Sequence, residues 1–491
     1  MEVPDEKSTL SKPWRRSSRA RLGLLCVPVT RPSRVARRSD FTADQIRSLW
    51  MAGIRTTGAS LLTALLLAGS VQVVVAQEDA EGTGPGFKQG DIITYENLDA
   101  LKSYLPDPFW DNRDFFFYEG MQLEIGPFYR DYSGPEAYKA ATERGRGQAR
   151  IGPDNSLENF ESGRPFPMDE IDCATDPQAG VKIMWNFDYA WAGAGGNASF
   201  YYSYWDRGEE LPLYYEGDSK SVFLSHRVEP QYEKSKGDVF RNEKRKNAFG
   251  VDVSAPFDAR GIMLMSYRYK TTDLPRKQAK NDDTWVYLPT LRRVRRISTA
   301  QRTDSISGTD FTFDDLNSFA GIVPQYEWEC LGELDLIAPS NTKVLGFPYE
   351  RDHNFGPYGL SFADDRWEVR KVIKVRMIPK NEDHPYHHKD IYIDKQTMRA
   401  LYSFAYDQKE ELWKIIWHNK RWSGEELTED YYPGWEGVPE PRAHQMVSDI
   451  ITNVQTGTGN RIEFWDANGV PFKSKGKIRR YIDVGRLTKG R

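Results

Sequence analysis

Cysteine is scarce in this sequence. The chain has 491 residues and only three cysteines, which excludes a small fold held together mainly by disulfide bonds. A large excess of charge of one sign is also missing, because 67 basic and 71 acidic side chains leave a formal net charge of −4. Since nucleic-acid-binding proteins usually carry a strongly basic surface, we expect no nucleic acid partner.

Long hydrophobic runs are almost absent. Only residues 59–76 are apolar for long enough to cross a bilayer, which excludes a protein with several membrane spans. The run follows a basic lead-in and ends at Ala76, so we predict a cleaved signal peptide over residues 51–76. A signal anchor is the alternative. Residues 1–50 are rich in arginine and have no hydrophobic period, and we predict that they are a non-native upstream extension.

The rest of the chain predicts a mainly β fold with some helices. Tyrosine and tryptophan are abundant, with 26 and 14 residues, and aromatic side chains favour strands. Residues 77–152 are predicted to form a helical or irregular segment with helices at 97–105 and 135–144, and residues 153–485 a curved β domain. Clear strand patterns occur at residues 200–205, 261–269, 285–288, 294–298, 367–378, 391–394, 398–406 and 412–418.

An alternating pattern at residues 181–189 predicts one more strand. Apolar and polar side chains alternate there, which places all the large apolar ones on one face. Three aromatic residues of that face are predicted to line a cavity for a hydrophobic ligand: Trp185, Phe187 and Tyr189. Packing in an ordinary core is the alternative for each of them.

Residues 282–321 contain an unusual block of arginines. A strand at 285–288 is followed by a turn at Pro289 and by a return strand that contains Arg292, Arg293, Arg295 and Arg296. Further on, Thr312 and Asp315 have the spacing of a helix-capping pair. We therefore predict a short helix over residues 313–319.

This block resembles the LolA-like outer-membrane lipoprotein-sorting family. The resemblance rests on Trp285-Val-Tyr-Leu-Pro289, Arg292-Arg-Val-Arg-Arg296 and Gly308-Thr-Asp-Phe-Thr312. Outside the block the chain looks like the domain-of-unknown-function 1329 family, with the marks Gly163-Arg-Pro-Phe-Pro167, Trp185-Asn186, Pro385-Tyr386, Tyr406-Asp407 and Leu412-Trp-Lys414. Together these resemblances cover nearly all of residues 85–485.

The resemblance implies a large, curved, unclosed antiparallel half-barrel plugged by helices, with a second sheet as a further elaboration. Such a fold offers an apolar concavity for acyl chains. The resemblance therefore implies a non-enzymatic periplasmic carrier of a lipid or other hydrophobic ligand, working beside an inner-membrane transporter of the resistance-nodulation-division type. A more specific expectation is that this periplasmic carrier associates peripherally with the outer membrane.

Two roles remain open for the arginine block. Alternation places Arg293 and Arg295 on one face, where their guanidinium groups can bind a lipid head group. The interpretation that we favour is a structural ion-pair network around Arg292, Arg296, Asp310 and Asp314. Four further aspartates can also neutralise the arginines: Asp282, Asp283, Asp304 and Asp315. Trp285, Tyr287 and Phe311 complete the predicted ligand-binding set.

The remaining candidates give weaker signals. Cys173 and Cys330 either pair in an oxidising compartment or remain free thiols. His384, His387 and His388 are candidate metal ligands with Asp383 or Asp390, but we favour a solvated loop and expect no metal site or cofactor.

Catalytic motifs with a recognisable mechanism are absent from the sequence, so we name no catalytic residue. Two alternatives to a carrier stay open. One is a structural adaptor of an envelope transporter complex, and the other is a hydrolase of envelope lipid or glycan.

Overall fold

The computed structural model describes residues 86–208, 211–297, 302–343, 355–424, 442–468 and 474–489. The chain divides into two units, Met1–Asp79 and Ala80–Arg491. The first unit, with the predicted extension and signal peptide, lies outside the described residues. All the described residues belong to the second unit.

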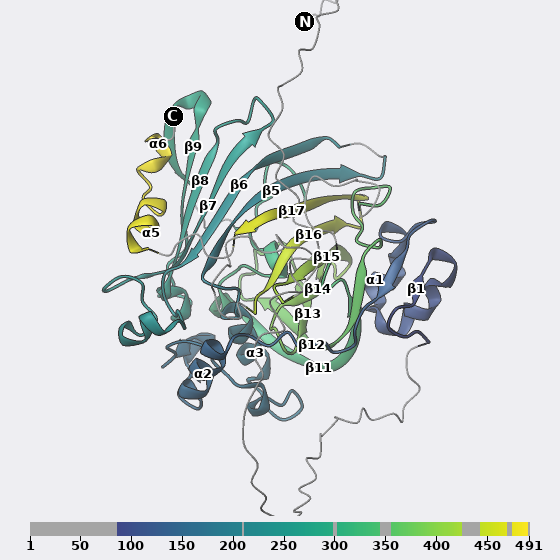
Figure 1. Ribbon diagram of the computed structural model, residues 1–491, viewed down its shortest axis with the longest axis horizontal. Coiled ribbons are helices and arrows are strands. Elements are labelled where there is room, and N and C mark those ends of the chain that lie inside the picture. The colour runs from purple at the N-terminus through teal and green to yellow at the C-terminus, as the bar shows by residue number, and fades with distance from the viewer. Residues whose placement is uncertain are drawn as a thin grey trace, which may run out of the picture. The chain divides into compact units, whose positions relative to one another are not determined.

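One 15-stranded sheet dominates this unit (Figure 1). Its order is β1-β2-β12-β13-β14-β15-β16-β17-β5-β6-β7-β8-β9-β10, and β11 also pairs with β12. All pairings are antiparallel except the parallel pair β2–β12. In the described residues no pairing joins β1 to β10, so the sheet is unclosed, as predicted. The strands are β1 Ile92–Ile93, β2 Leu123–Ile125, β5 Gly195–Asp206, β6 Leu213–Phe223, β7 Arg245–Ala255, β8 Met263–Tyr269, β9 Asp283–Leu288, β10 Arg293–Ile297, β11 Tyr326–Ala338, β12 Arg366–Pro379, β13 His388–Asp394, β14 Ala400–Tyr406, β15 Leu412–Trp422, β16 His444–Asn453 and β17 Thr458–Asn468.

A second sheet has only two strands, β3 (Arg150–Ile151) and β4 (Leu157–Glu158). The α-helices are short: α1 Asp107–Asp111, α2 Glu136–Gly145, α3 Ala179–Asp188, α5 Lys475–Tyr481 and α6 Arg486–Lys489. None of the helices in the described part of the chain has the length and apolarity needed to cross a membrane. The 3-10 turns are η1 Tyr95–Tyr104, η2 Arg113–Phe115, η3 Pro153–Asn155, η4 Met168–Glu170, η5 Pro230–Ser235, η6 Lys270–Asp273, η7 Pro289–Leu291, η8 Leu316–Ser318 and η9 Val323–Gln325.

The strand predicted at residues 181–189 is wrong, because these residues form α3. Eight of the ten residues of α3 are buried, and a helix that is buried nearly all round has no polar stripe to reveal its period. The helix lies directly against β11, since a Cβ atom on Gly180 would come within 2.6 Å of the Trp328 carbonyl oxygen. A start signal is present in the sequence at Asp176, whose side chain accepts a hydrogen bond from the Gln178 amide.

The helix predicted at residues 313–319 is also wrong. Only the 3-10 turn η8 forms there, because Asn317 and Ser318 have φ angles of 55° and 68°, in the left-handed region that ends a helix. The predicted capping contact nevertheless exists, with the Thr312 hydroxyl donating to the Asp315 carboxylate at 2.9 Å.

The sheet is buried on both faces over its central strands. On β5, Tyr201 packs into a cluster with Trp367 and Trp417, whereas the next residue, Tyr202, packs into a different cluster with Phe311. Since successive side chains of a strand point to opposite faces, these two clusters lie on opposite sides of the sheet. The described N-terminal residues join the first cluster, whereas α5 and α6 pack on β7–β9 in a third one.

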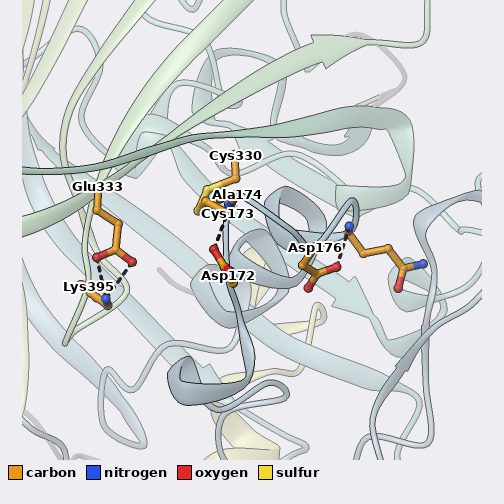
Figure 2. Close-up of a disulfide and its surroundings, with 8 residues drawn as sticks. Asp172, Cys173, Ala174, Asp176, Cys330, Glu333 and Lys395 are labelled. Carbon is orange, nitrogen blue, oxygen red and sulfur yellow. Dashed lines mark hydrogen bonds and ion pairs between the residues drawn. A yellow bond between two sulfur atoms is a disulfide. The ribbon is translucent and has the colours of Figure 1, made fainter.

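The structure contains a disulfide bond between Cys173 and Cys330, with their Cα atoms 5.3 Å apart (Figure 2). Cys173 precedes α3 and Cys330 lies in β11, so the bond ties the helix to the strand on which it packs. The pairing alternative of the sequence is therefore the one found in the structure.

Candidate ligand-binding cavity

A cavity of about 1010 Å³ opens against one face of strands β5–β9 and β17. Pockets for small ligands usually have volumes of about 300–1,000 Å³, so this one lies at the upper end. Its strand walls also carry polar residues, but most of their large side chains are apolar: Phe200, Tyr202, Tyr215, Phe223, Phe249, Val251, Val253, Leu264, Val286, Ile462 and Phe464.

The opposite wall comes from the irregular segment of residues 302–320. It contributes four large apolar side chains to the cavity: Ile306, Phe311, Phe313 and Leu316. The segment is held to the sheet by Asp315, whose carboxylate binds Lys389 of β13 at 2.7 Å and Lys414 of β15 at 3.2 Å. These two ammonium groups hold the pKa of Asp315 far below its usual range.

One charged part of the cavity wall is internally neutralised. The guanidinium groups of Arg268 and Arg302 both bind the Asp282 carboxylate, at 3.1 and 2.6 Å, and Arg302 also pairs with Asp314. Arg268 and Arg302 further donate to the Ala320 carbonyl, at 2.6 and 2.7 Å. This network therefore fixes the end of the 302–320 segment against β8.

A second charged part of the wall comes from β15, β16 and the residue before β14, and it holds Arg399, His418, Lys420 and His444. Lys420 is only 3% exposed, and burial lowers its pKa to about 7. Its ammonium group donates to the Ala400 carbonyl at 2.5 Å. His444 donates to the Ser340 carbonyl at 2.6 Å, and burial lowers its pKa to about 3, so its ring is neutral.

Two of the predicted ligand-binding residues, Phe187 and Phe311, line the cavity. Trp185 is instead buried in the core beneath α3 and donates to the Asn155 carbonyl at 3.0 Å. The Tyr189 hydroxyl binds Asp273. Trp185 and Tyr189 are absent from the cavity wall formed by the described residues, because the helix directs them away from the face that carries Phe187.

Trp285 and Tyr287 lie on the wrong face of β9 for the predicted role. Their neighbours Thr284 and Val286 line the cavity, whereas Trp285 and Tyr287 pack in the cluster that contains α5 and α6. Alternation thus identified the two faces of β9 correctly. It did not show which face the C-terminal helices cover, because those helices lie nearly 200 residues further along the chain.

The predicted ion-pair network forms only in part. Arg296 pairs with Asp283, one of the predicted aspartates, whereas Asp314 pairs with Arg302 outside the arginine block. Asp310 accepts hydrogen bonds from Asn453 and Thr458, at 2.7 and 2.6 Å. Arg292 is exposed at a turn with φ of 48°.

Arg293 and Arg295 are exposed on β10 at one end of the strand order. Residues that pair across antiparallel strands share a face, and Arg295 pairs with Val286, which lines the cavity. The two arginines therefore lie beside the cavity on its own side of the sheet, outside its described wall.

We predict that Arg293→Ala/Arg295→Ala changes the free energy of unfolding by less than about 0.5 kcal/mol, because both side chains are exposed. If they attract lipid head groups, the rate of loading from anionic vesicles falls in the double variant. Thermal melting and stopped-flow loading test this expectation. A protein that fails to fold contradicts it and shows a structural role instead.

The histidine segment is not the solvated loop that we favoured. His384 and His388 are each 8% exposed, and burial lowers the pKa of His384 to about 4. The Asp390 carboxylate binds Arg376 and Lys374, at 2.7 and 3.0 Å. In the described part of the chain these residues form no cluster of three or more metal-ligating side chains.

Residues 92–476 match the family described as "Protein of unknown function (DUF1329)". The chain belongs to this family. A curated relative, the uncharacterized protein PA3922 of Pseudomonas aeruginosa, is 24% identical over 300 residues, which are 60% of this chain and 61% of the relative.

Two solved structures are similar to the DUF1329 chain. A DUF1329 family protein from Desulfovibrio piger has 17% identity and a TM-score of 0.42, and the match covers 64% of this chain and all of that one. The LolA superfamily protein NE2245 from Nitrosomonas europaea has 10% identity and a TM-score of 0.33, with 60% and 92% covered.

Most of the residues that line the cavity were not predicted from the sequence. Phe200 and Tyr202 are visible as an alternating pair in an aromatic strand, and that pattern could have identified them. Lys420 and Arg399 gave no signal, because isolated basic residues in strand sequences usually face solvent.

Proposed function

We propose that this chain binds a lipid or another hydrophobic molecule in the cavity and carries it through the periplasm. The observation that carries the proposal is the apolar wall of β5–β9 facing the apolar side of the 302–320 segment. Burial of an acyl chain between them is worth about 0.8 kcal/mol per CH₂ group. Because this term depends on chain length more than on identity, we expect loose selectivity for the chain.

The resemblance of the arginine block to lipoprotein-sorting proteins supports this role. The disulfide supports an oxidising compartment, such as the periplasm. Release of a well-buried chain requires a partner or a conformational change that offsets the burial energy, and we propose an inner-membrane transporter as that partner. The proposed role includes no chemical step.

Native mass spectrometry of the gently purified protein, followed by lipid extraction, tests the proposal. We expect a bound mass that disappears on extraction and an extracted molecule that contains an acyl chain. Protein that carries no hydrophobic molecule and takes none up from vesicles contradicts the carrier role and favours an adaptor without its own ligand.

We predict that Val253→Trp weakens binding of a fluorescent fatty acid by about tenfold or more, because the indole fills part of the cavity that the chain occupies. Fluorescence titration measures the affinity. The matched control is Ser254→Trp, which adds the same side chain at the next, exposed residue of β7. Equal losses in both variants contradict binding in this cavity.

A further inference from the structure

The charged part of the wall contains two basic side chains that no carboxylate of the described residues contacts directly. Lys420 and Arg399 each donate to a backbone carbonyl, of Ala400 at 2.5 Å and of Ala190 at 3.0 Å. Within the described residues, neither side chain has a carboxylate oxygen within 4.0 Å. An ammonium group has three donors and a guanidinium group five, so both retain capacity for a further acceptor.

The carboxylates whose charges act on these two side chains are in direct contact with other groups. Asp449 lies 3.0 Å from His418, whose pKa is lowered by burial, and Asp394 pairs with Arg370 at 2.6 Å. Asp188, the carboxylate that acts on Arg399, binds Lys246, which Asp273 also binds at 2.9 Å. The two cations also repel each other, since the charge of Arg399 lowers the pKa of Lys420.

A buried charge without a partner is costly to the folded state. The other basic residues around the cavity follow the usual pattern: Arg268 and Arg302 share Asp282, and Lys220 pairs with Asp252. Lys420 and Arg399 depart from this pattern, because no carboxylate in the described part of the chain contacts either of them directly. The geometry is that of a site for a molecule with a long apolar part and one acidic end.

We propose that Lys420 and Arg399 bind the acidic head group, a carboxylate or a phosphate, of the lipid held in the cavity. This inference rests on the proposed carrier function. The acyl chain lies along the apolar walls of β5–β9, and the head group lies against β14–β16. The head group then places an anion in direct contact with both basic side chains, which gives an acidic lipid an advantage over an uncharged one of equal length.

Isothermal titration with three probes tests this: a C16 fatty acid, the C16 alcohol and inorganic phosphate. We expect the acid to bind at least about tenfold more tightly than the alcohol, with phosphate far weaker than either. Equal affinities of acid and alcohol overturn the head-group site and leave the carrier function standing. Binding of neither probe contradicts the carrier function itself. Tight binding of phosphate alone overturns a lipid source for the anion.

We predict that Lys420→Met lowers the affinity for the acid by about tenfold or more and leaves that for the alcohol unchanged. Methionine fills similar space without a charge, so the variant also melts at or above the wild-type temperature. The control is Lys371→Met, which removes an ammonium group that is mostly exposed on β12. Equal loss of acid and alcohol binding in Lys420→Met indicates a merely structural lysine and overturns the proposal.

Discussion

Asp315→Asn is expected to lower the free energy of unfolding by about 3–5 kcal/mol, the usual cost of breaking a buried ion pair. The carboxylate is completely buried and binds Lys389 and Lys414, whose side chains are 1% and 3% exposed. It also accepts a hydrogen bond from the Tyr386 hydroxyl at 2.7 Å. An amide leaves two buried ammonium groups without their anion. Denaturant unfolding followed by tryptophan fluorescence measures the loss.

The matched control is Glu333→Gln, which removes a carboxylate from a pair with Lys395 in which both side chains are partly exposed (Figure 2). Such a pair contributes about 1 kcal/mol or less. A loss for Asp315→Asn no greater than that of this control contradicts the role of Asp315 as the anchor of the 302–320 segment.

The wild type and Asp315→Asn differ in their free energy of unfolding, and the pH dependence of that difference follows from the pKa of Asp315. The two lysines hold that pKa far below its value in the unfolded chain, which is about 3.9. The carboxylate therefore contributes its full stability above that value and loses it only as the pH falls toward the folded-state pKa. The difference between the wild type and Asp315→Asn is expected to be the same at pH 7 as at pH 5.5.

The antiparallel sheet was predictable because its strands carry their own pattern. Residues 412–418 and 391–394 are mostly apolar and rich in β-branched and aromatic side chains, and they form parts of β15 and β13. The sequence pattern failed at α3 for a physical reason. A helix enclosed by β11, β12 and its own flanking loops needs no polar stripe, so its apolar spacing fits a strand equally well.

The cavity itself was only partly predictable. Alternation separates the two faces of β5 and β9, but whether a face meets a cavity or a helix depends on the distant residues that cover it. Lys420 shows the limit most clearly. A lysine in a strand sequence predicts an exposed position, and only the folded sheet brings it beside Arg399 in a buried wall.

Removal of the disulfide, by Cys173→Ser/Cys330→Ser, is expected to lower the free energy of unfolding by about 2–5 kcal/mol, because the bond limits the freedom of the unfolded chain. The two cysteines are 157 residues apart in sequence, so the loop that they close is long. The bond also fixes α3, which carries Phe187 into the cavity wall. We therefore expect weaker binding of the fluorescent fatty acid as well. Thermal melting and the fluorescence titration measure the two effects.

Reduction of the wild-type protein serves as the companion experiment. A thiol reductant is expected to lower the melting temperature of the wild type toward that of the double variant, and to leave the double variant unchanged. Thiol titration of the unfolded, unreduced protein is expected to detect neither Cys173 nor Cys330. Reaction of these two thiols without reductant, or a melting temperature that does not respond to the reductant, contradicts the bond. Loss of lipid binding in the double variant with unchanged stability instead assigns the bond a role in positioning α3 at the cavity.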